Sequence, residues 1–111
     1  MTMTTNKALS RLGLAMRAGK LVTGEESVLK AIRSGDAKLV LLAGDASELT
    51  RKKVEDKCGS YNVPLLIGYT RYELGGAVGK PERVLFAVTD RGFADLIRSG
   101  WVQQSEVENI D

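Results

Sequence analysis

Residues 21–35, LVTGEESVLKAIRSG, contain a short strand, a glycine turn and one helix, and the rest of the chain is organised around them. The first three residues are apolar or β-branched, and Gly24 permits a sharp turn into a helix that Gly35 ends. Apolar residues recur on one side of this helix: Val28, Leu29 and Ile32. Small α/β domains usually bind ligands where a strand leads into a helix N-terminus, so the turn at Gly24 is the first candidate site.

The composition is that of one ordinary globular domain. A chain of 111 residues is long enough to bury roughly two thirds of its unfolded surface without staples. It is 43% hydrophobic and 27% charged, and no apolar run approaches the about 18 residues that a membrane span needs. The first ten residues, MTMTTNKALS, lack the pattern of a secretory signal. We therefore expect a cytoplasmic protein that makes no contact with membranes.

Cysteine and histidine usage excludes several kinds of site. Cys58 is the single cysteine and the chain has no histidine, which excludes an internal disulfide, a histidine-containing zinc site and a histidine-based catalytic triad. We expect no metal and no cofactor.

Charge is unevenly distributed along the chain. Residues 102–111 hold three acidic residues and no basic one, so residues 1–101 hold 16 basic against 11 acidic residues. We expect a domain over residues 1–101 and a disordered acidic tail over residues 102–111. The mildly basic domain is compatible with nucleic-acid binding.

Helical and strand patterns alternate along the whole chain. We expect helices over residues 5–18, 25–34, from Ser47 to near Gly59, 70–77 and from Thr89 or Asp90 to Gly100, and strands over residues 21–23, 38–43, 64–67 and 84–88. The buried sides of three helices are expected to carry Ala8, Leu9, Leu12, Ala15 and Met16, then Leu49, Val54 and Cys58, then Phe93, Leu96 and Ile97. The basic run Arg51–Lys53 is expected to be a solvated face.

This alternation predicts an α/β fold, in the form of a three-layer α/β/α sandwich, because right-handed crossovers place helices on both faces of a sheet. The helix segments are expected to have 10 to 15 residues. The segment from Lys38 to Ala43 is continuously apolar after its lysine, as in a central strand covered on both faces. Three strands end in loops at Gly24, Gly44 and Gly68. If these strands are parallel, the loops meet at one edge of the sheet, which is the predicted site.

The candidate residues at this edge come from three loops and their surroundings: Arg17, Lys20, Gly24, Glu25, Glu26, Ser27, Lys30, Asp45, Tyr69, Thr70 and Arg71. The sequence has neither the GxGxxG pattern of dinucleotide sites nor the GxxxxGK[ST] phosphate loop. Two acidic residues at the helix entry also argue against a free mononucleotide as the ligand.

Three candidates have two interpretations each. Thr23 and Glu26 fit a capping box, but a carboxylate at this position also accepts hydrogen bonds from the donor edge of a nucleobase. Lys30 is either a solvated lysine or, one turn beyond Glu26, a contact to the same ligand. Tyr69 is either partly buried or stacks on a splayed base. Thr70 and Glu73 fit a second capping box.

Three segments resemble the kink-turn RNA-binding ribosomal protein superfamily, and within it the YlxQ-type bacterial proteins. They are GEESVLKAIRSGDAKLVLLAGDAS (24–47), NVPLLIGYTRYELGGAVGK (62–80) and RVLFAV (83–88). The resemblance extends from about Leu9 to Ile97. It implies a three-layer α/β/α fold with a mixed four-stranded sheet, and RNA contact at the helix entry near Gly24.

The resemblance assigns the family's helix-entry motif to residues 24–27 and Lys30. Gly24 and Lys30 match this motif, whereas Glu26 stands where kink-turn binders usually have asparagine or lysine, and Ser27 where they often have glutamate or glutamine. These departures argue against reading of tandem sheared G·A pairs but not against binding of a structured RNA. The family's second contact loop falls on residues 68–71, where Tyr69 would stack on a base and Arg71 would pair with phosphate.

We therefore expect a non-catalytic RNA-binding protein that is associated with ribosomal or another structured RNA and is monomeric when free. Ribosomal or translation proteins are further candidate partners. Two alternatives remain open. One is an RNA-recognition module or subunit of an RNA-modifying enzyme such as a ribose methyltransferase. The other is a protein-interaction adaptor that uses the charged helix over residues 51–57.

Overall fold

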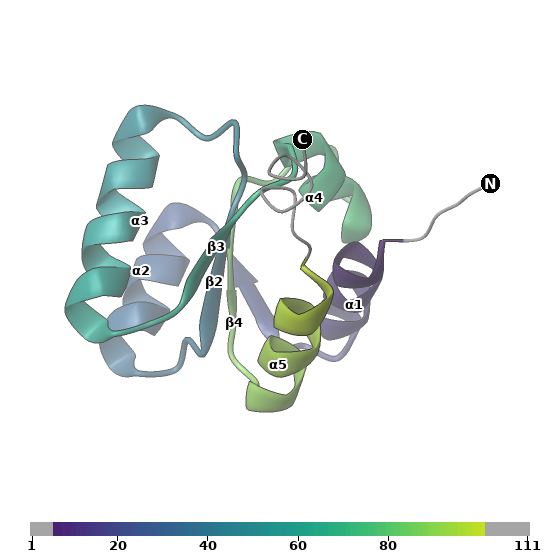
Figure 1. Cartoon of the computed structure of the whole chain (residues 1–111), viewed down its shortest axis with the longest axis horizontal. Coiled ribbons are helices and arrows are strands. Elements are labelled where there is room, and N and C mark those ends of the chain that lie inside the picture. The colour runs from purple at the N-terminus through teal and green to yellow at the C-terminus, as the bar shows by residue number, and fades with distance from the viewer. Residues whose placement is uncertain (1–5, 102–111) are drawn as a thin grey trace, which may run out of the picture.

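The computed structural model describes residues 6–101, and the expected acidic tail lies outside this range. Within it, helices and strands alternate in the expected order (Figure 1). They are α1 (Lys7–Arg17), β1 (Leu21–Thr23), α2 (Glu25–Ser34), β2 (Leu39–Leu42), α3 (Glu48–Tyr61), β3 (Leu65–Ile67), α4 (Arg71–Ala77), β4 (Leu85–Val88) and α5 (Arg91–Gly100). The α/β/α sandwich with a mixed four-stranded sheet is confirmed.

The strands form one sheet in the order β1-β4-β2-β3. β4 is antiparallel to both of its neighbours, with Ala87 opposite Val22 on one side and Val40 on the other, whereas β2 and β3 are parallel. β1, β2 and β3 therefore point in the same direction, and their carboxyl ends share one edge of the sheet. β4 begins at that same edge.

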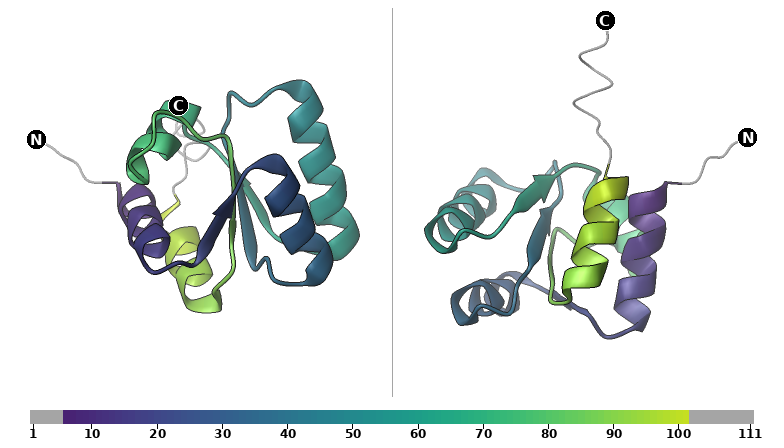
Figure 2. Two further views of the ribbon diagram at one scale, coloured as in Figure 1. Left: turned by 180° about the vertical axis from the view of Figure 1, so that it is seen from behind. Right: turned by 60° about the horizontal axis from the view of Figure 1, so that its bottom comes forward.

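Helices cover both faces of the sheet and create two cores. α2 and α3 cover one face, and α1, α4 and α5 cover the other (Figures 1 and 2). The two buried strands serve both cores because successive side chains point to opposite faces: Leu39 and Leu41 contact the α1/α4/α5 side, and Val40 and Leu42 contact the α2/α3 side. All four side chains are fully buried.

Most helix ends have the expected caps. Ser47 and Asp90 cap α3 and α5 by accepting hydrogen bonds from backbone amides, and Thr70 and Glu73 form the expected capping box at α4. The basic run at the start of α3 is the expected solvated face, since Arg51 and Lys52 form exposed i,i+4 ion pairs at 3.2 and 3.9 Å.

Four details differ from the expectation. α3 continues through Gly59 to Tyr61, because Asn62 rather than the glycine takes the left-handed conformation (φ 57°) that ends it. α4 has only 7 residues. Leu49 and Leu96 are 67% and 47% exposed. Leu49 precedes Val54 by five positions, which rotates it about 140° away from the buried side, and Leu96 is about 100° from Ile97.

The segment after α4 folds back over that helix. A Cβ atom on Gly75 would lie 2.5 Å from the Glu82 Cα atom, so only glycine permits this approach. The backbone amide of Arg83 donates to the Arg71 carbonyl at 3.0 Å. This packing holds residues 79–84 at the edge of the sheet where β1, β2 and β3 end. None of the helices within residues 6–101 combines the length and hydropathy needed to cross a membrane.

Candidate functional site

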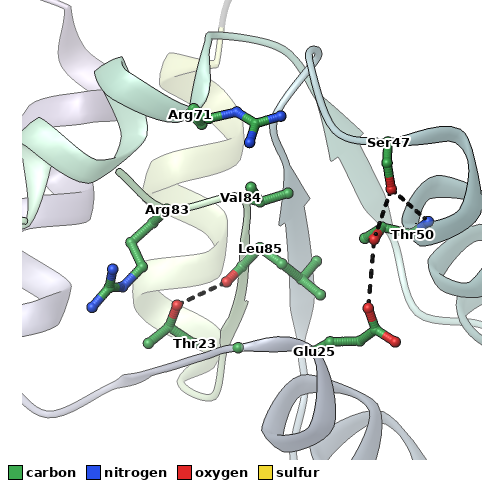
Figure 3. Close-up of a pocket in the computed structure, with 9 residues that line it drawn as sticks. Thr23, Glu25, Ser47, Thr50, Arg71, Arg83, Val84 and Leu85 are labelled. Carbon is green, nitrogen blue, oxygen red and sulfur yellow. Dashed lines mark hydrogen bonds between the residues drawn. The ribbon is translucent and has the colours of Figure 1, made fainter. Parts of the chain in front are cut away.

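A pocket of about 230 Å³ lies at the shared edge of the sheet. Figure 3 shows Arg71, Val84 and Leu85 between Thr23 on one side and Ser47 and Thr50 on the other. The complete lining is Thr23, Gly24, Glu25, Ser47, Thr50, Arg71, Arg83, Val84 and Leu85. The pocket thus joins the end of β1, the starts of α2, α3 and α4, and the start of β4.

The entry of α2 has no side-chain cap. Gly24 has φ 97° and ψ 145°, which other residues adopt only with strain. The hydroxyl of Thr23 donates to the Leu85 carbonyl at 3.0 Å, across β1 and β4, instead of accepting from the helix (Figure 3). The Thr23–Glu26 capping box is therefore wrong, and the first-turn amides of α2 carry the positive end of the helix dipole without a side chain covering them.

Glu25 is turned towards α3. Its carboxylate lies 3.0 Å from Lys53 Nζ and accepts a long hydrogen bond of 3.5 Å from the Thr50 hydroxyl. Lys53 therefore compensates much of the negative charge that Glu25 brings to the α2 entry. The contact also ties α2 to α3 beside the pocket.

Glu26, Ser27 and Lys30 are exposed on the first turns of α2, outside the pocket lining. Glu26 and Lys30 are separated by four positions, so they lie one above the other on the same helix face. In residues 6–101, no ion pair includes either of them. They offer an exposed acceptor and an exposed cation side by side, next to the uncapped amides.

Asp45 orients Arg71 at the pocket wall. The Asp45 carboxylate accepts from the Arg71 backbone amide at 3.0 Å and lies 3.4 Å from the Arg71 Nε atom, and the guanidinium also donates to the Asp45 carbonyl at 2.6 Å. Glu82 approaches the same guanidinium at 3.7 Å. The Arg71 side chain keeps 32% of its exposure. Two carboxylates thus hold Arg71 in place and reduce the positive charge that it presents.

Tyr69 does not face solvent as a stacking platform. It is 7% exposed, its ring packs edge to face on Trp101 at a centroid distance of 4.6 Å, and its hydroxyl donates to Asn6 Oδ1 at 3.1 Å. The partial-burial interpretation is the correct one, and the expected stacking on a base is wrong for this conformation. Thr70, its neighbour, is committed to capping α4.

Lys20 and Arg17 lie away from the pocket. Lys20 precedes β1, whereas Gly24 follows it, so the length of that strand, roughly 13 Å, separates them. The Lys20 carbonyl accepts from the Thr89 amide at the opposite edge of the sheet. Arg17 lines another hollow, between α1 and the end of α4. Arg17 and Lys20 are close to Gly24 in sequence, but β1 runs between them and Gly24, so both lie away from the pocket.

The segment before β4 was not among the site residues expected from the sequence. Arg83, Val84 and Leu85 line the pocket, and Leu85 lies directly beside Thr23, which precedes the α2 entry (Figure 3). Arg83 donates to the neighbouring Glu82 carbonyl at 2.7 Å, and no ion pair joins it to a carboxylate in the described part of the chain. An antiparallel assignment for residues 84–88 would have placed their beginning at this edge.

The chemistry available at the pocket is recognition by charge and hydrogen bonding. Within residues 6–101 no three histidine, cysteine or acidic side chains are grouped to hold a metal ion. Burial raises the pKa of the Cys58 thiol to about 11, so this buried group between α3 and the sheet stays protonated at neutral pH. What the site offers is backbone amides, hydroxyls, two arginines and an exposed acid.

Comparison with known proteins assigns the family. Residues 6–97 match the model of the ribosomal protein L7Ae/L30e/S12e/Gadd45 family. The RNA-binding protein YlxQ of Bacillus subtilis (strain 168) is 54% identical over 88 residues, which are 79% of this chain and 88% of that protein. The large ribosomal subunit protein eL30 of Branchiostoma belcheri is 40% identical over 96 residues, 81% of each chain.

Among solved structures, a protein of unknown function from Bacillus halodurans C superposes with a TM-score of 0.84 and 48% identity, over 86% of this chain and 96% of that one. The matched residues 6–97 include every residue of the pocket and of the α2 entry. The chain belongs to the ribosomal protein L7Ae/L30e/S12e/Gadd45 family.

Proposed function

We propose that this protein binds a structured RNA through the entry of α2 and the segment of residues 79–84. The observation that carries the proposal is the N-terminus of α2, which has no side-chain cap, lines the same pocket as Arg83 and lies beside the exposed Lys30. Membership of a family with ribosomal proteins, and high identity to a protein named for RNA binding, support the same conclusion.

Each group at the site has a distinct role in this proposal. The first-turn amides of α2, Lys30 and Arg83 contact phosphates, and Arg71 adds a weaker contact because Asp45 and Glu82 already hold it. Glu26 accepts hydrogen bonds from base amino or imino groups and so selects sequence. Gly24 has no side chain, which allows a sugar–phosphate backbone to approach the turn closely.

The proposal extends to the setting in which the protein acts. It is a cytoplasmic, monomeric protein with no catalysis of its own, and ribosomal RNA is the first RNA to test. The similarity to eL30, which is named as a large ribosomal subunit protein, supports this choice.

Binding to two hairpin RNAs tests the proposal. One hairpin carries a kink-turn with tandem sheared G·A pairs, and the other has Watson–Crick pairs in their place. Fluorescence anisotropy is measured across a salt series with the full chain. Contacts from Lys30, Arg71 and Arg83 to three phosphates predict a log–log slope of roughly −2 to −3 for a bound hairpin. Binding that does not change with salt, or no binding to either hairpin or to ribosomal RNA fragments, contradicts the proposal.

A further inference from the structure

A second charged hollow lies at the opposite edge of the sheet from the α2 entry. Two pockets of about 340 and 210 Å³ adjoin there and share Lys38, Pro64 and Arg91. They lie between the ends of α2 and α3, the starts of β2 and β3, and α5. We call this hollow the basic groove, defined by Arg33, Lys38, Tyr61, Asn62, Arg91 and Arg98.

The basic groove has an excess of positive charge. Four of its side chains are cationic, and Asp95 is the one acidic residue that lines the two pockets. Within residues 6–101 no ion pair includes Arg33, Lys38, Arg91 or Arg98. The carboxyl ends of α2 and α3 also point here, and each contributes about −0.5 charge, whereas the amino end of α5 contributes about +0.5. Over the side chains that line the two pockets and these helix ends, the balance of charge is positive.

An exposed aromatic ring adjoins these cations. Tyr61, the last residue of α3, is 46% exposed and lines the groove beside Asn62. Asn62, in the left-handed conformation (φ 57°), ends α3 directly after Tyr61. The Tyr61 ring therefore belongs to the last turn of the helix, at the rim of the basic groove. A cationic channel with an exposed aromatic side chain is the arrangement that binds unpaired nucleotides, because phosphates meet the cations and a base stacks on the ring.

The α2 helix connects the two sites. Gly24 precedes its first residue at the candidate RNA site, and Gly35 follows its last residue at the groove. Its ten residues span about 15 Å, roughly the length of four to five stacked nucleotides. Lys30 and Arg33 are exposed, and they lie three positions apart along this path.

We propose that the basic groove binds an unpaired RNA segment that continues from the RNA held at the α2 entry. Arg33, Arg91 and Arg98 contact its phosphates and Tyr61 stacks on one base. This inference rests on the proposed function, since both sites engage one RNA molecule. An acidic peptide would use the same cations but would not need the tyrosine ring.

Titration of the full ¹⁵N-labelled chain with a single-stranded uridine decamer tests the groove directly. We expect amide signals of residues 33–38, 61–64 and 91–98 to shift. Tyr61→Leu is expected to weaken decamer binding about fivefold or more, whereas Tyr61→Phe, which keeps the ring, binds as the wild type does. Arg33→Ala/Arg91→Ala is expected to reduce the magnitude of the salt slope by about 1.4, which the charge-matched control Arg51→Ala/Lys52→Ala does not do.

Two results overturn the inference and are distinguishable from failure of the proposed function. Shifts confined to residues 24–27 and 83–85 would show RNA binding at the α2 entry without the groove. Shifts at the groove with a free VQQSEVENID peptide, and none with the decamer, would assign the groove to an acidic peptide. The proposed function fails separately if the hairpin RNAs do not bind at the α2 entry.

Discussion

The ammonium group of Lys53 lies 3.0 Å from the Glu25 carboxylate and ties the second turn of α3 to the first turn of α2. The two side chains are 49% and 38% exposed, so water screens the pair. Its main consequence is local. Lys53 compensates the charge of Glu25 and holds its carboxylate towards α3. Glu26 is then the exposed acid beside the first-turn amides of α2.

A double-mutant cycle of Glu25→Gln and Lys53→Met measures this contact. We expect a coupling free energy of about 0.2 to 1 kcal/mol in urea unfolding, because exposed pairs gain little in a high-dielectric setting. Lys52→Met, on the same helix and outside the pair, serves as the control. A coupling near zero would show that Lys53 does not hold Glu25 in solution.

Gly24→Ala tests the conformation of the α2 entry. The observed φ of 97° strains any L side chain, so we expect a loss of about 1 to 3 kcal/mol in the free energy of unfolding, measured by urea denaturation. Gly59→Ala is the matched control. Gly59 lies inside α3 with open space around its Cβ position, so alanine there should stabilise by about 0.5 to 1 kcal/mol. Equal effects at both positions would contradict the strained entry.

The periodicity of apolar residues was sufficient to predict the helix and sheet layers, because burial in the core determines where apolar residues recur. The continuous apolar run at residues 39–43 identified β2, which is buried on both faces, and Val54 and Cys58 identified the inner side of α3. The exposed Leu49 shows the limit of this reasoning. Its spacing of five positions from Val54 places it about 140° from the buried side, so helical geometry rather than apolar character decides its exposure.

The candidate site could be predicted only in part, because strand direction decides which loops meet. The loops after β1, β2 and β3 were expected to converge, and they do. The contribution of Arg83 was missed because β4 runs antiparallel and begins at this edge. Lys20 was expected to border this edge because it is near Gly24 in sequence, but it lies at the other end of β1. The burial of Tyr69 depends on Trp101 and Asn6, distant in sequence, which no local pattern reveals.

Tyr69→Phe tests the correction at that residue. The change removes a hydroxyl that donates to Asn6 at 3.1 Å, so we expect a loss of about 0.5 to 1.5 kcal/mol in the free energy of unfolding. RNA affinity should stay within twofold of the wild-type value for Tyr69→Phe and also for Tyr69→Leu in its folded state. A large loss of affinity specific to Tyr69→Leu would restore the ring as a stacking surface.

Cys58 makes stability depend on alkaline pH. Its pKa is raised from 9.0 to about 11 by burial, so the folded state holds the thiol proton more tightly than the unfolded state does. The resulting stability is fully present below pH 9 and is lost as the pH rises from 9 to about 11. A shift of this size corresponds to about 2 to 3 kcal/mol. Cys58→Ala should show a flatter decline than the wild type in urea unfolding across this range; identical declines would contradict the shift.

Binding at the α2 entry is tested by comparing the RNA affinities of Lys30→Ala, Arg83→Ala and the control Lys52→Ala, each of which removes one positive charge. The RNA is whichever of the two hairpins or ribosomal fragments the wild type binds, and fluorescence anisotropy is the readout. We expect Lys30→Ala and Arg83→Ala each to weaken binding by about 1 kcal/mol or more and to reduce the salt slope by about 1, while Lys52→Ala has little effect. Equal losses for all three variants would show attraction by net charge alone and would contradict a site at the α2 entry.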